Sequence, residues 1–253
     1  MKYITLFETA TAFEAARATL DLPNVSLIEA TNGINYLPYV APVVQQHDYV
    51  EIGGIKWATM NVGANSITDT GLYFQWGDTQ GYTASQVGRD EGEKYFGWPD
   101  YKYSNSTTAS DTGTITKYNE SDGLTTLQSS DDAVTAAWGG NWRTPTTAEF
   151  AALGAAVNSA WTADYQGSGV AGLVLTDKTD SSKVLFFPSA SYCCNGSVGT
   201  GSVGDVSYGF YWSSSVGSSD VQYAHNLRFT SSEVFWQDYD YRHYGFTVRG
   251  VVS

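Results

Sequence analysis

The chain has 253 residues, enough to bury a full hydrophobic core, and 42% of them are hydrophobic. Charged and aromatic residues each make up 15% and there are 26 glycines, a composition that favours a loop-rich β-containing domain over a helical bundle or a disordered chain. The formal net charge of −13 argues against nucleic acid and against an anionic membrane surface as partners, because both are bound mainly through Lys and Arg.

The first 47 residues predict a small separate unit. Thr11 and Glu14 have the spacing of a capping box, so a short helix is expected from Thr11 to Leu20. The segments VSLIEA and INYLPYV then read as two strands around a tight turn at Asn32-Gly33. One helix and one hairpin bury little surface, so we expect this unit to pack on a second copy, on the main domain or on a larger assembly.

The N-terminus does not read as a targeting segment. Glu8 and Glu14 interrupt any apolar stretch of a signal peptide, and no apolar run approaches the ~20 residues of a membrane span. We therefore expect a protein made in the cytoplasm without a signal peptide and without membrane insertion.

A main domain is predicted over residues 48–253. The segment VEIGGIKWATMNVG predicts two strands around Gly53-Gly54, and GLYFQWGD predicts a further aromatic strand. From Thr79 to Leu127 the chain is polar and lacks periodicity, which indicates long surface loops.

Two short helices are expected next. SDDAVTAAWGG has acidic residues in its first turn and a stop at Gly139. Thr146 and Glu149 form a second capping box, and its helical face would hold Phe150, Leu153 and Val157. Short strands are then predicted at Val184–Phe187, Gly209–Trp212, Leu227–Phe229 and Phe246–Val252. Helices followed by a string of strands indicate an α+β domain with helices packed against antiparallel sheets.

The loops of residues 189–244 have the composition of a binding surface. Tyr and Trp offer large contact area with few torsions to order, and Ser, Gly and Asn offer adaptable hydrogen bonds. Trp212, Trp236 and Phe246 fit the strand pattern and are assigned to the core. The predicted ligand-binding residues are Tyr192, Cys193, Cys194, Asn195, Tyr208, Phe210, Ser218, Asp220, Tyr223, His225, Asn226, Arg228, Phe235, Gln237, Asp238, Tyr239, Asp240, Tyr241, His243 and Tyr244.

Cys193 and Cys194 are the two cysteines of the chain, and they are adjacent. They cannot close an ordinary disulfide loop, and no third cysteine is present to pair with either. We interpret them as reduced thiols in a variable loop, with a vicinal disulfide or a two-thiolate metal site as the alternatives.

Four motifs carry a resemblance that spans Tyr49 to Ser253: WRTPT followed by EF at 142–150, FPSA at 187–190, YWSS at 211–214 and GFTVRG at 245–250. In this order they resemble the C-type-lectin-like fold in its formylglycine-generating-enzyme-like branch. Within it the chain is most similar to the variable proteins of diversity-generating retroelements, which phages and bacteria use to diversify binding proteins. The resemblance implies a hypervariable ligand-binding display protein.

In that family, error-prone reverse transcription randomises adenines, so AAC codons scatter into Asn, Asp, His, Tyr, Ser, Cys and Phe among others. The pair Cys193-Cys194, the run Asp238–Tyr241 and the pair His243-Tyr244 fit that outcome. Gln222 and Gln237 are not reachable from AAC. The N-terminal segment resembles leaders on structural proteins of gut bacteriophages, which implies attachment to a virion; the alternative location is a bacterial cell surface.

Chemical activity is not expected. The copper-binding cysteine pair of formylglycine-generating enzymes has no counterpart, because the thiols here are vicinal. His225 or His243 with a serine and an aspartate would make a triad, but no nucleophile elbow is present. Sugar-binding lectin signatures are missing apart from an echo, WPD at 98–100, although Asp238 and Asp240 offer calcium ligands. We predict no enzyme activity, no cofactor and no metal site.

The expected partner is a host-surface protein or glycan, with the N-terminal unit serving homo-oligomer or virion assembly. The rivals are a constant bacterial carbohydrate-binding or adhesion domain of the same fold and an oxygenase or hydrolase. We predict that replacing Tyr239, Tyr241, His243 and Tyr244 together by Ser leaves the melting temperature almost unchanged, because these side chains are expected to be exposed.

Overall fold

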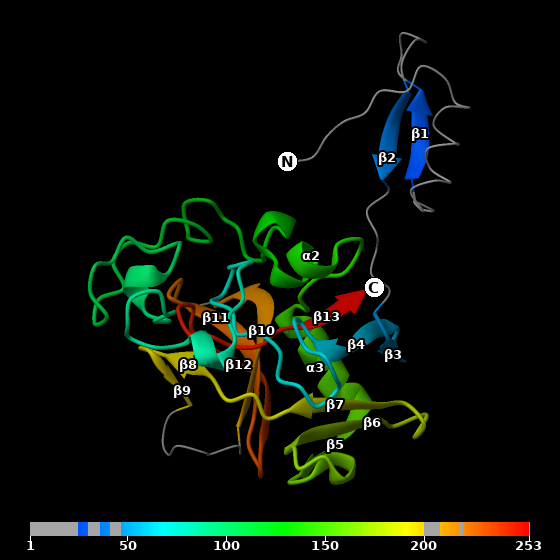
Figure 1. Ribbon diagram of the computed structural model, residues 1–253. Coiled ribbons are helices and arrows are strands. Elements are labelled where there is room, and N and C mark those ends of the chain that lie inside the picture. Colours follow the sequence, from blue (N-terminus) through cyan, green and yellow to red (C-terminus); the bar gives the residue numbers. More distant parts are fainter. Residues whose placement is uncertain (1–24, 30–35, 41–46, 200–207, 218–219, 253) are drawn as a thin grey trace. The chain divides into compact units, whose positions relative to one another are not determined.

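The computed structural model describes residues 25–29, 36–40, 47–199, 208–217 and 220–252. Its chain divides into two compact units, Met1–Gln45 and Gln46–Ser253. In the first unit, β1 (Val25–Glu29) and β2 (Tyr36–Val40) pair as an antiparallel hairpin with Val25 opposite Val40 (Figure 1). The predicted hairpin is confirmed, whereas the helix predicted over residues 11–20 lies outside the described residues.

Antiparallel sheets make up most of the second unit. The order β13-β4-β3 joins β3 (Tyr49–Ile52), β4 (Ile55–Asn61) and β13 (Arg249–Val252). A second sheet holds β5 (Val157–Thr162), β6 (Gly172–Asp177) and β7 (Val184–Pro188). A third holds β10 (Gly209–Val216), β11 (Tyr223–Phe229) and β12 (Val234–Tyr241), and a short pair is formed by β8 (Cys193–Cys194) and β9 (Ser197–Val198).

Two α-helices begin where the sequence predicted. Helix α2 (Ala133–Trp138) is capped by Asp132, whose Oδ1 accepts from the backbone N–H groups of Val134 and Thr135 at 2.9 and 3.0 Å. Helix α3 (Thr147–Ala156) begins with the capping box of Thr146 and Glu149. Together with the antiparallel strands, these helices confirm the α+β class.

Shorter elements complete the described chain. The 3-10 helices are η1 (Ala84–Gln86), η2 (Trp98–Asp100), η3 (Ser129–Asp131) and η4 (Tyr165–Gly167). Two details differ from expectation. Val157 opens β5 instead of extending α3, and the segment GLYFQWGD forms isolated bridges at Tyr73 and Phe74 instead of a regular strand.

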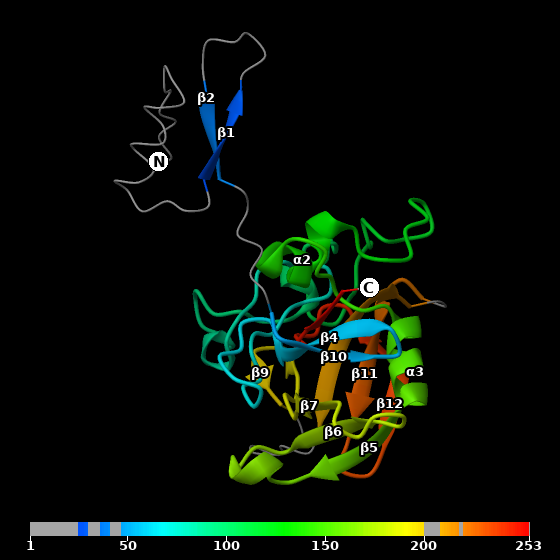
Figure 2. The same ribbon diagram turned by 90° about the vertical axis from the view of Figure 1, so that its right-hand side faces the viewer.

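The first hydrophobic core lies around α3, which runs alongside the β10-β11-β12 sheet (Figure 2). Phe150 and Leu153 of α3 are both buried there, as expected for one face of an amphipathic helix. Their neighbours are large apolar side chains from all three sheets: Trp57, Leu173, Leu175, Leu185, Phe187, Tyr211, Leu227, Phe229 and Val251. This core fixes the inner face of the third sheet.

A second core corrects the interpretation of residues 79–127 as surface loops. The segment has little regular structure, as predicted, yet it contributes five large buried side chains to this core: Trp98, Tyr101, Tyr103, Ile115 and Tyr118. They pack with Phe210, Trp212 and Phe246. Burial of aromatic rings therefore replaces strand pairing as the force that orders this segment. Periodicity does not reveal such burial, because the rings come from irregular backbone.

Two buried arginines join distant segments. Arg249 donates to Asn61 Oδ1 at 2.7 Å and to two backbone carbonyl oxygens, those of Ala58 at 2.9 Å and Phe186 at 3.0 Å. Arg242 donates to the carbonyl oxygens of Lys117 at 3.0 Å and Tyr118 at 2.5 Å. Each guanidinium also lies over an aromatic ring, Phe187 for Arg249 and Trp76 for Arg242, at 4.4 and 4.7 Å.

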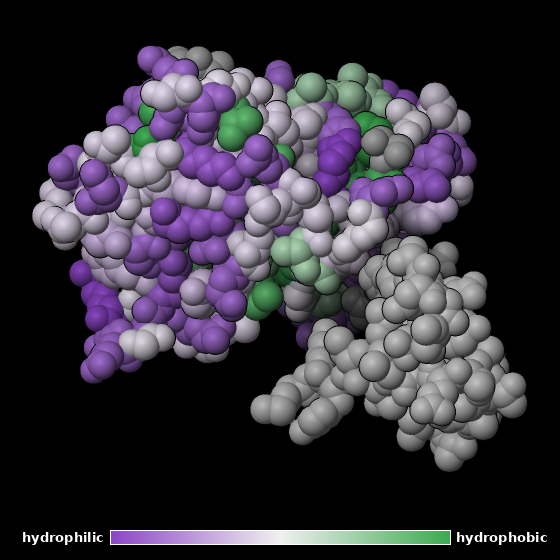
Figure 3. All heavy atoms as spheres, turned by 90° about the horizontal axis from the view of Figure 1, so that it is seen from above, coloured by the Kyte–Doolittle hydropathy of each residue, from purple (hydrophilic) through white to green (hydrophobic). Residues whose placement is uncertain are grey.

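The surface drawn in Figure 3 is mainly hydrophilic or near neutral, with apolar residues in small separate patches. Among the described residues, Tyr49, Ile67, Val198 and Tyr239 are the large hydrophobic side chains that are exposed. Single exposed apolar residues are normal on a folded domain, so this surface by itself does not mark an interface.

We expect Arg249→Met to lower the free energy of unfolding by at least about 2 kcal/mol, because it leaves three buried acceptors without a donor and each such group costs about 1–3 kcal/mol. The change is measured by urea unfolding. Arg89→Met is the matched control, since Arg89 is exposed and its replacement should stay within about 0.5 kcal/mol. Equal stabilities for the two variants would contradict the role given to Arg249.

Candidate ligand-binding pocket

The outer face of the third sheet gathers polar and aromatic side chains. In the antiparallel register Phe210 lies opposite Arg228, Asn226 opposite Asp238, and Ala224 opposite Asp240. Opposed residues share a face of the sheet, so these side chains project away from α3 and its core. A bulge between Asn226 and Arg228 adds one residue to β12, which keeps Phe235 on the same face.

A cavity of about 410 Å³ opens on this face. It is lined by Tyr192, Phe210, Arg228, Asp238, Tyr239, Asp240, Tyr244 and Phe246. All of these except Phe246 were predicted as ligand-binding residues. The sequence missed Phe246 because an apolar residue in a strand pattern carries no sign that one edge of its ring also reaches a cavity.

Aromatic rings form the wall of the cavity. The Tyr192 ring lies 5.0 Å from that of Phe210 and stacks with that of Tyr244 at 5.7 Å. Phe210 and Phe246 are 4.9 Å apart, and Phe246 stacks on the buried Trp212 at 4.0 Å. The aromatic rings of the cavity wall therefore pack against the second core, which fixes their positions. Tyr239 differs, because 56% of its side chain is exposed at the edge of the cavity.

The two carboxylates of the cavity have different surroundings. Asp238 forms an ion pair with Arg228, whose guanidinium also lies 4.3 Å from the centre of the Phe235 ring. Asp240 accepts one hydrogen bond among the described residues, from Asn226 Nδ2 at 3.2 Å. Burial, and then the neighbouring Asp238 carboxylate, raise the pKa of Asp240 to about 7. Asp240 is therefore a half-buried acid that, among the described residues, forms no ion pair of its own, because the nearby Arg228 is paired with Asp238.

Several predicted residues surround the cavity without lining it. Tyr208 stacks near Phe210 at 6.5 Å, and Asn195 donates to Cys194 Sγ at 3.3 Å. Tyr223 contacts the rings of Tyr239 and Tyr241 at 5.4 and 4.6 Å, and His225 lies 6.4 Å from Tyr239. Gln237 is exposed at the bulge.

Two predicted residues lie elsewhere. Asp220 lines a separate cavity of about 300 Å³ with Tyr118 and Val216. Ser218 falls outside the described residues.

Cys193 was expected in an exposed loop, and this expectation is wrong. Its side chain is fully buried against Tyr73 and Phe96, and its backbone exchanges hydrogen bonds with Gly245 at 2.8 Å. Burial raises the pKa of its thiol, so the group stays protonated and unreactive. Cys194 points the other way along β8 and is half-buried. Adjacent positions on a strand face opposite sides, which separates the two thiols.

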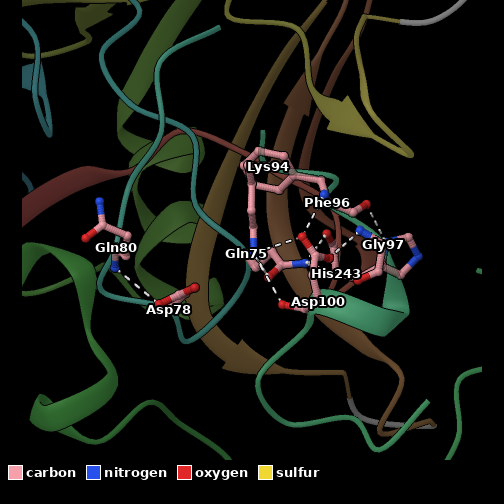
Figure 4. A network of polar contacts seen from close by, with 8 residues as sticks. All are labelled: Gln75, Asp78, Gln80, Lys94, Phe96, Gly97, Asp100 and His243. Atoms are coloured by element: carbon pink, nitrogen blue, oxygen red, sulfur yellow. Dashed lines mark hydrogen bonds and ion pairs between the residues drawn. The ribbon is translucent and has the colours of Figure 1, made fainter. Parts of the chain in front are cut away.

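His243 is the second correction, since it is 4% exposed. Its Nδ1 lies 3.0 Å from the carbonyl oxygen of Phe96, and its own carbonyl oxygen accepts from Gln75 Nε2 at 3.1 Å (Figure 4). The ring also lies 4.4 Å from that of Trp98. Burial lowers the pKa of His243, so the neutral imidazole is favoured.

The network around His243 extends to an ion pair. Lys94 Nζ lies 3.1 Å from Asp100 Oδ2 and donates to Gln75 Oε1 at 2.7 Å (Figure 4). Asp100 also accepts from the backbone N–H groups of Phe96 and Gly97 at 3.1 and 2.7 Å. Asp100, the last residue of the WPD sequence, therefore holds the chain turn beneath His243.

Asn226 is the third correction, because its side chain is fully buried beneath Asp240 and does not reach the surface. The expectation that variable residues lie in loops is also corrected in part. Arg228 and His225 lie in β11, and the run Asp238–Tyr241 lies in β12. Their positions are set by strand pairing. Arg228, Asp238 and Asp240 share the outer face and line the cavity, whereas Tyr239 alternates with the two aspartates and reaches the cavity only at its edge.

The described residues contain no group of three or more His, Cys, Asp or Glu side chains arranged to hold a metal ion. Nor does any helix among them have the length and apolar character needed to cross a membrane. Comparisons with protein-family models, with curated proteins and with solved structures found no match.

Single substitutions distinguish the exposed side chains of this site from the buried ones that stabilise the fold. We expect Tyr239→Ser to change the melting temperature little, because that ring is mostly exposed. His243→Ser should lower stability by about 2–4 kcal/mol, since it opens a cavity beside Trp98 and removes the bond to Phe96. Thermal unfolding of the two variants measures the difference, and similar melting temperatures would contradict it. The fourfold Ser variant should therefore be clearly destabilised.

The raised pKa of Asp240 makes stability depend on pH. Between about pH 4 and pH 7 the folded state holds a proton that the unfolded state has released, so this group's contribution to stability falls as the pH rises. Asp240→Asn removes that titration. We compare the free energy of unfolding of the variant with that of the unsubstituted protein. We expect the difference, variant minus unsubstituted protein, to be at least about 1 kcal/mol larger at about pH 8 than at about pH 5.

The measurement for Asp240→Asn is urea unfolding at both pH values. Glu233→Gln removes an exposed carboxylate from the same β-hairpin and serves as the control. A difference between Asp240→Asn and the unsubstituted protein that stays constant with pH would contradict the assigned pKa.

Proposed function

We propose that this chain is a non-enzymatic, hypervariable ligand-binding display protein, related to the variable proteins of diversity-generating retroelements. The observation that carries the proposal is the gathering of Tyr192, Asp238, Tyr239, Asp240 and Tyr244 around one cavity. Two segments about 45 residues apart supply them, and both were singled out from composition and from the family resemblance. A binding site is the simplest function for residues that converge in this way on an open face.

The proposed mechanism divides the work between frame and surface. Arg242 and His243 are buried and hold the backbone, whereas Asp240 and Tyr244, which flank this segment in the sequence, line the cavity. An exposed side chain such as Tyr239 is then free to vary with an effect on stability of about 0.5 kcal/mol or less. The domain presents different chemistry on an unchanged scaffold.

The finer fold assignment belongs to this proposal: a C-type-lectin-like domain of the formylglycine-generating-enzyme-like branch. Its support is that the WRTPT motif has a structural role that a family motif should have. Arg143 forms two hydrogen bonds to Glu149, at 2.7 and 2.6 Å, and Glu149 completes the capping box of α3. Thr144 also binds Asp132, the cap of α2. One short motif thereby fixes the start of both helices.

The proposed ligand is a host-surface protein or glycan, bound by a phage particle that carries the domain through its N-terminal unit. A standard protein interface covers about 800 Å² on each partner and depends on a few aromatic or Arg anchors. The exposed Tyr239 beside the cavity is such an anchor. Multiple copies on one particle would add avidity to a modest affinity.

The alternative is a constant carbohydrate-binding or adhesion domain of a bacterial cell surface. One observation favours it: aromatic rings beside carboxylates in an open cavity also suit a sugar, which stacks its apolar face and donates its hydroxyl protons. The two candidates differ in whether the lining varies between copies of the gene.

Sequencing the region downstream of the gene tests the proposal. We expect a second, imperfect copy of the gene's 3′ end, differing at adenines, and a nearby reverse transcriptase gene. The differences should fall on codons for Tyr192, Asp238, Tyr239, Asp240 and Tyr244 and should spare Trp212 and Arg242. Differences spread equally over buried and lining codons, or no repeat at all, would refute the proposal, and a glycan-array signal would then favour the alternative.

A further inference from the structure

The cavity on the third sheet contains an incomplete ion pair. Arg228 neutralises Asp238, so one positive charge is already used. Asp240 faces the same cavity and accepts a hydrogen bond from the neutral amide of Asn226. The cation that acts on it, Arg228, is paired with Asp238, so the two half-buried carboxylates share one positive charge, which is costly because burial weakens their solvation. A ligand that brings a positive charge would remove this cost.

The walls of the cavity suit the same kind of ligand. Tyr192, Phe210 and Tyr244 line the space, and the Tyr192 ring lies 5.0 Å from that of Phe210 and 5.7 Å from that of Tyr244. Cations bind over such rings through the ring quadrupole, and the attraction increases when water is excluded. The aromatic rings and the Asp240 carboxylate, which belong to separate segments of the chain, thus both favour a positively charged ligand.

The support beneath Asp240 is a neutral amide. Asn226 is fully buried, and its Nδ2 donates to Asp240. This hydrogen bond orients the Asp240 carboxylate without neutralising its charge. Ammonium and guanidinium groups donate hydrogen bonds and accept none, so they match the carboxylate oxygens that line the cavity.

We propose that this cavity binds an alkylammonium or guanidinium group carried by a lysine or arginine side chain of a partner protein. The inference deepens the proposed function and rests on it, because it assigns a chemical class to the ligand of that same pocket. A protein partner is favoured over a free small cation because Tyr239, exposed beside the cavity, offers contact area outside it. The net charge of −13 would also steer a basic partner toward this domain.

A divalent metal fits the cavity less well. Calcium takes six or more oxygen ligands, and one of the two carboxylates here, that of Asp238, is already paired with Arg228. Aromatic walls also supply no such ligands. The lining therefore distinguishes an organic cation from a metal ion by its own chemistry.

The first experiment uses simple probes on the intact protein. Isothermal titration calorimetry compares Nα-acetyl-lysine amide and Nα-acetyl-arginine amide with the neutral Nα-acetyl-norleucine amide. We expect at least one charged probe to bind about tenfold more tightly than the neutral one. Equal affinity for the charged and neutral probes, or no binding of any probe at millimolar concentration, would overturn the inference.

A second comparison locates the charge. Asp240→Asn should weaken binding of the charged probe about tenfold, whereas Glu233→Gln, which removes a carboxylate outside the cavity, should leave it within about twofold. An equal loss in both variants would mean that net charge, and not the cavity, binds the probe. That outcome also contradicts the inference.

The pH dependence of the unsubstituted protein keeps the test valid if Asp240→Asn fails to fold. The groups facing Asp240 are Asp238, Arg228, Tyr192 and Tyr244, and burial raises the pKa of both tyrosines above its usual value of about 10. Affinity for the charged probe should fall at least about threefold from pH 8 to pH 5.5, because protonation removes the charge of Asp240. A constant affinity would count against the inference.

The failure of this inference and the failure of the proposed function can be told apart. A downstream repeat with differences at the lining codons, together with no preference for charged probes, leaves the display function standing and removes the cation. A charged-probe preference without any repeat keeps the cation pocket and assigns it to a constant adhesion domain.

Discussion

The buried guanidinium of Arg249 is the constraint on which the arrangement of the second unit depends. It donates to Asn61, to the carbonyl oxygen of Ala58 and to that of Phe186, so β13, β4 and β7 meet at one side chain. Burial lowers its pKa only to about 10, and the group remains charged. A buried charge that has no carboxylate beside it requires all of its acceptors to stay in place. The strand that carries Arg249 follows directly from Phe246, so the same contact also positions the back of the cavity.

Strand geometry explains how one segment serves both the core and the cavity. On β11, Leu227 is buried against the core around α3, while its neighbour Arg228 lines the cavity. The alternation of side chains along a strand produces this separation without any special loop. A cavity wall built on paired strands is stiffer than one built on turns, because each residue is held by backbone hydrogen bonds on at least one side. This rigidity suits a site whose side chains differ while its backbone does not.

The sequence predicted what local chemistry determines. Thr146 and Glu149 marked the start of α3, since a cap requires only neighbours within a few residues. For α2 the acidic residues were predicted in the first turn, whereas Asp132 is the cap itself. The sequence also placed Tyr192 and Asp240 in one site, although composition and a resemblance carried that step. It failed for His243 and Tyr244, which are adjacent and similar in character but differ in burial. The partners that bury His243 are Gln75, Phe96 and Trp98, more than 140 residues earlier in the chain, and no local pattern announces such contacts.

The bulge in the third sheet has a consequence for how this surface can change. Between the pairs Asn226–Asp238 and Arg228–Phe235, β11 advances two residues while β12 advances three. Losing or gaining one residue there would turn every later side chain of β12 to the opposite face, exchanging Asp240 for its neighbours and placing charge against α3. Exchanges of one amino acid for another are compatible with this frame, whereas insertions and deletions are not. Any process that diversifies the site must therefore change the side chains while it keeps the number of residues in these strands constant.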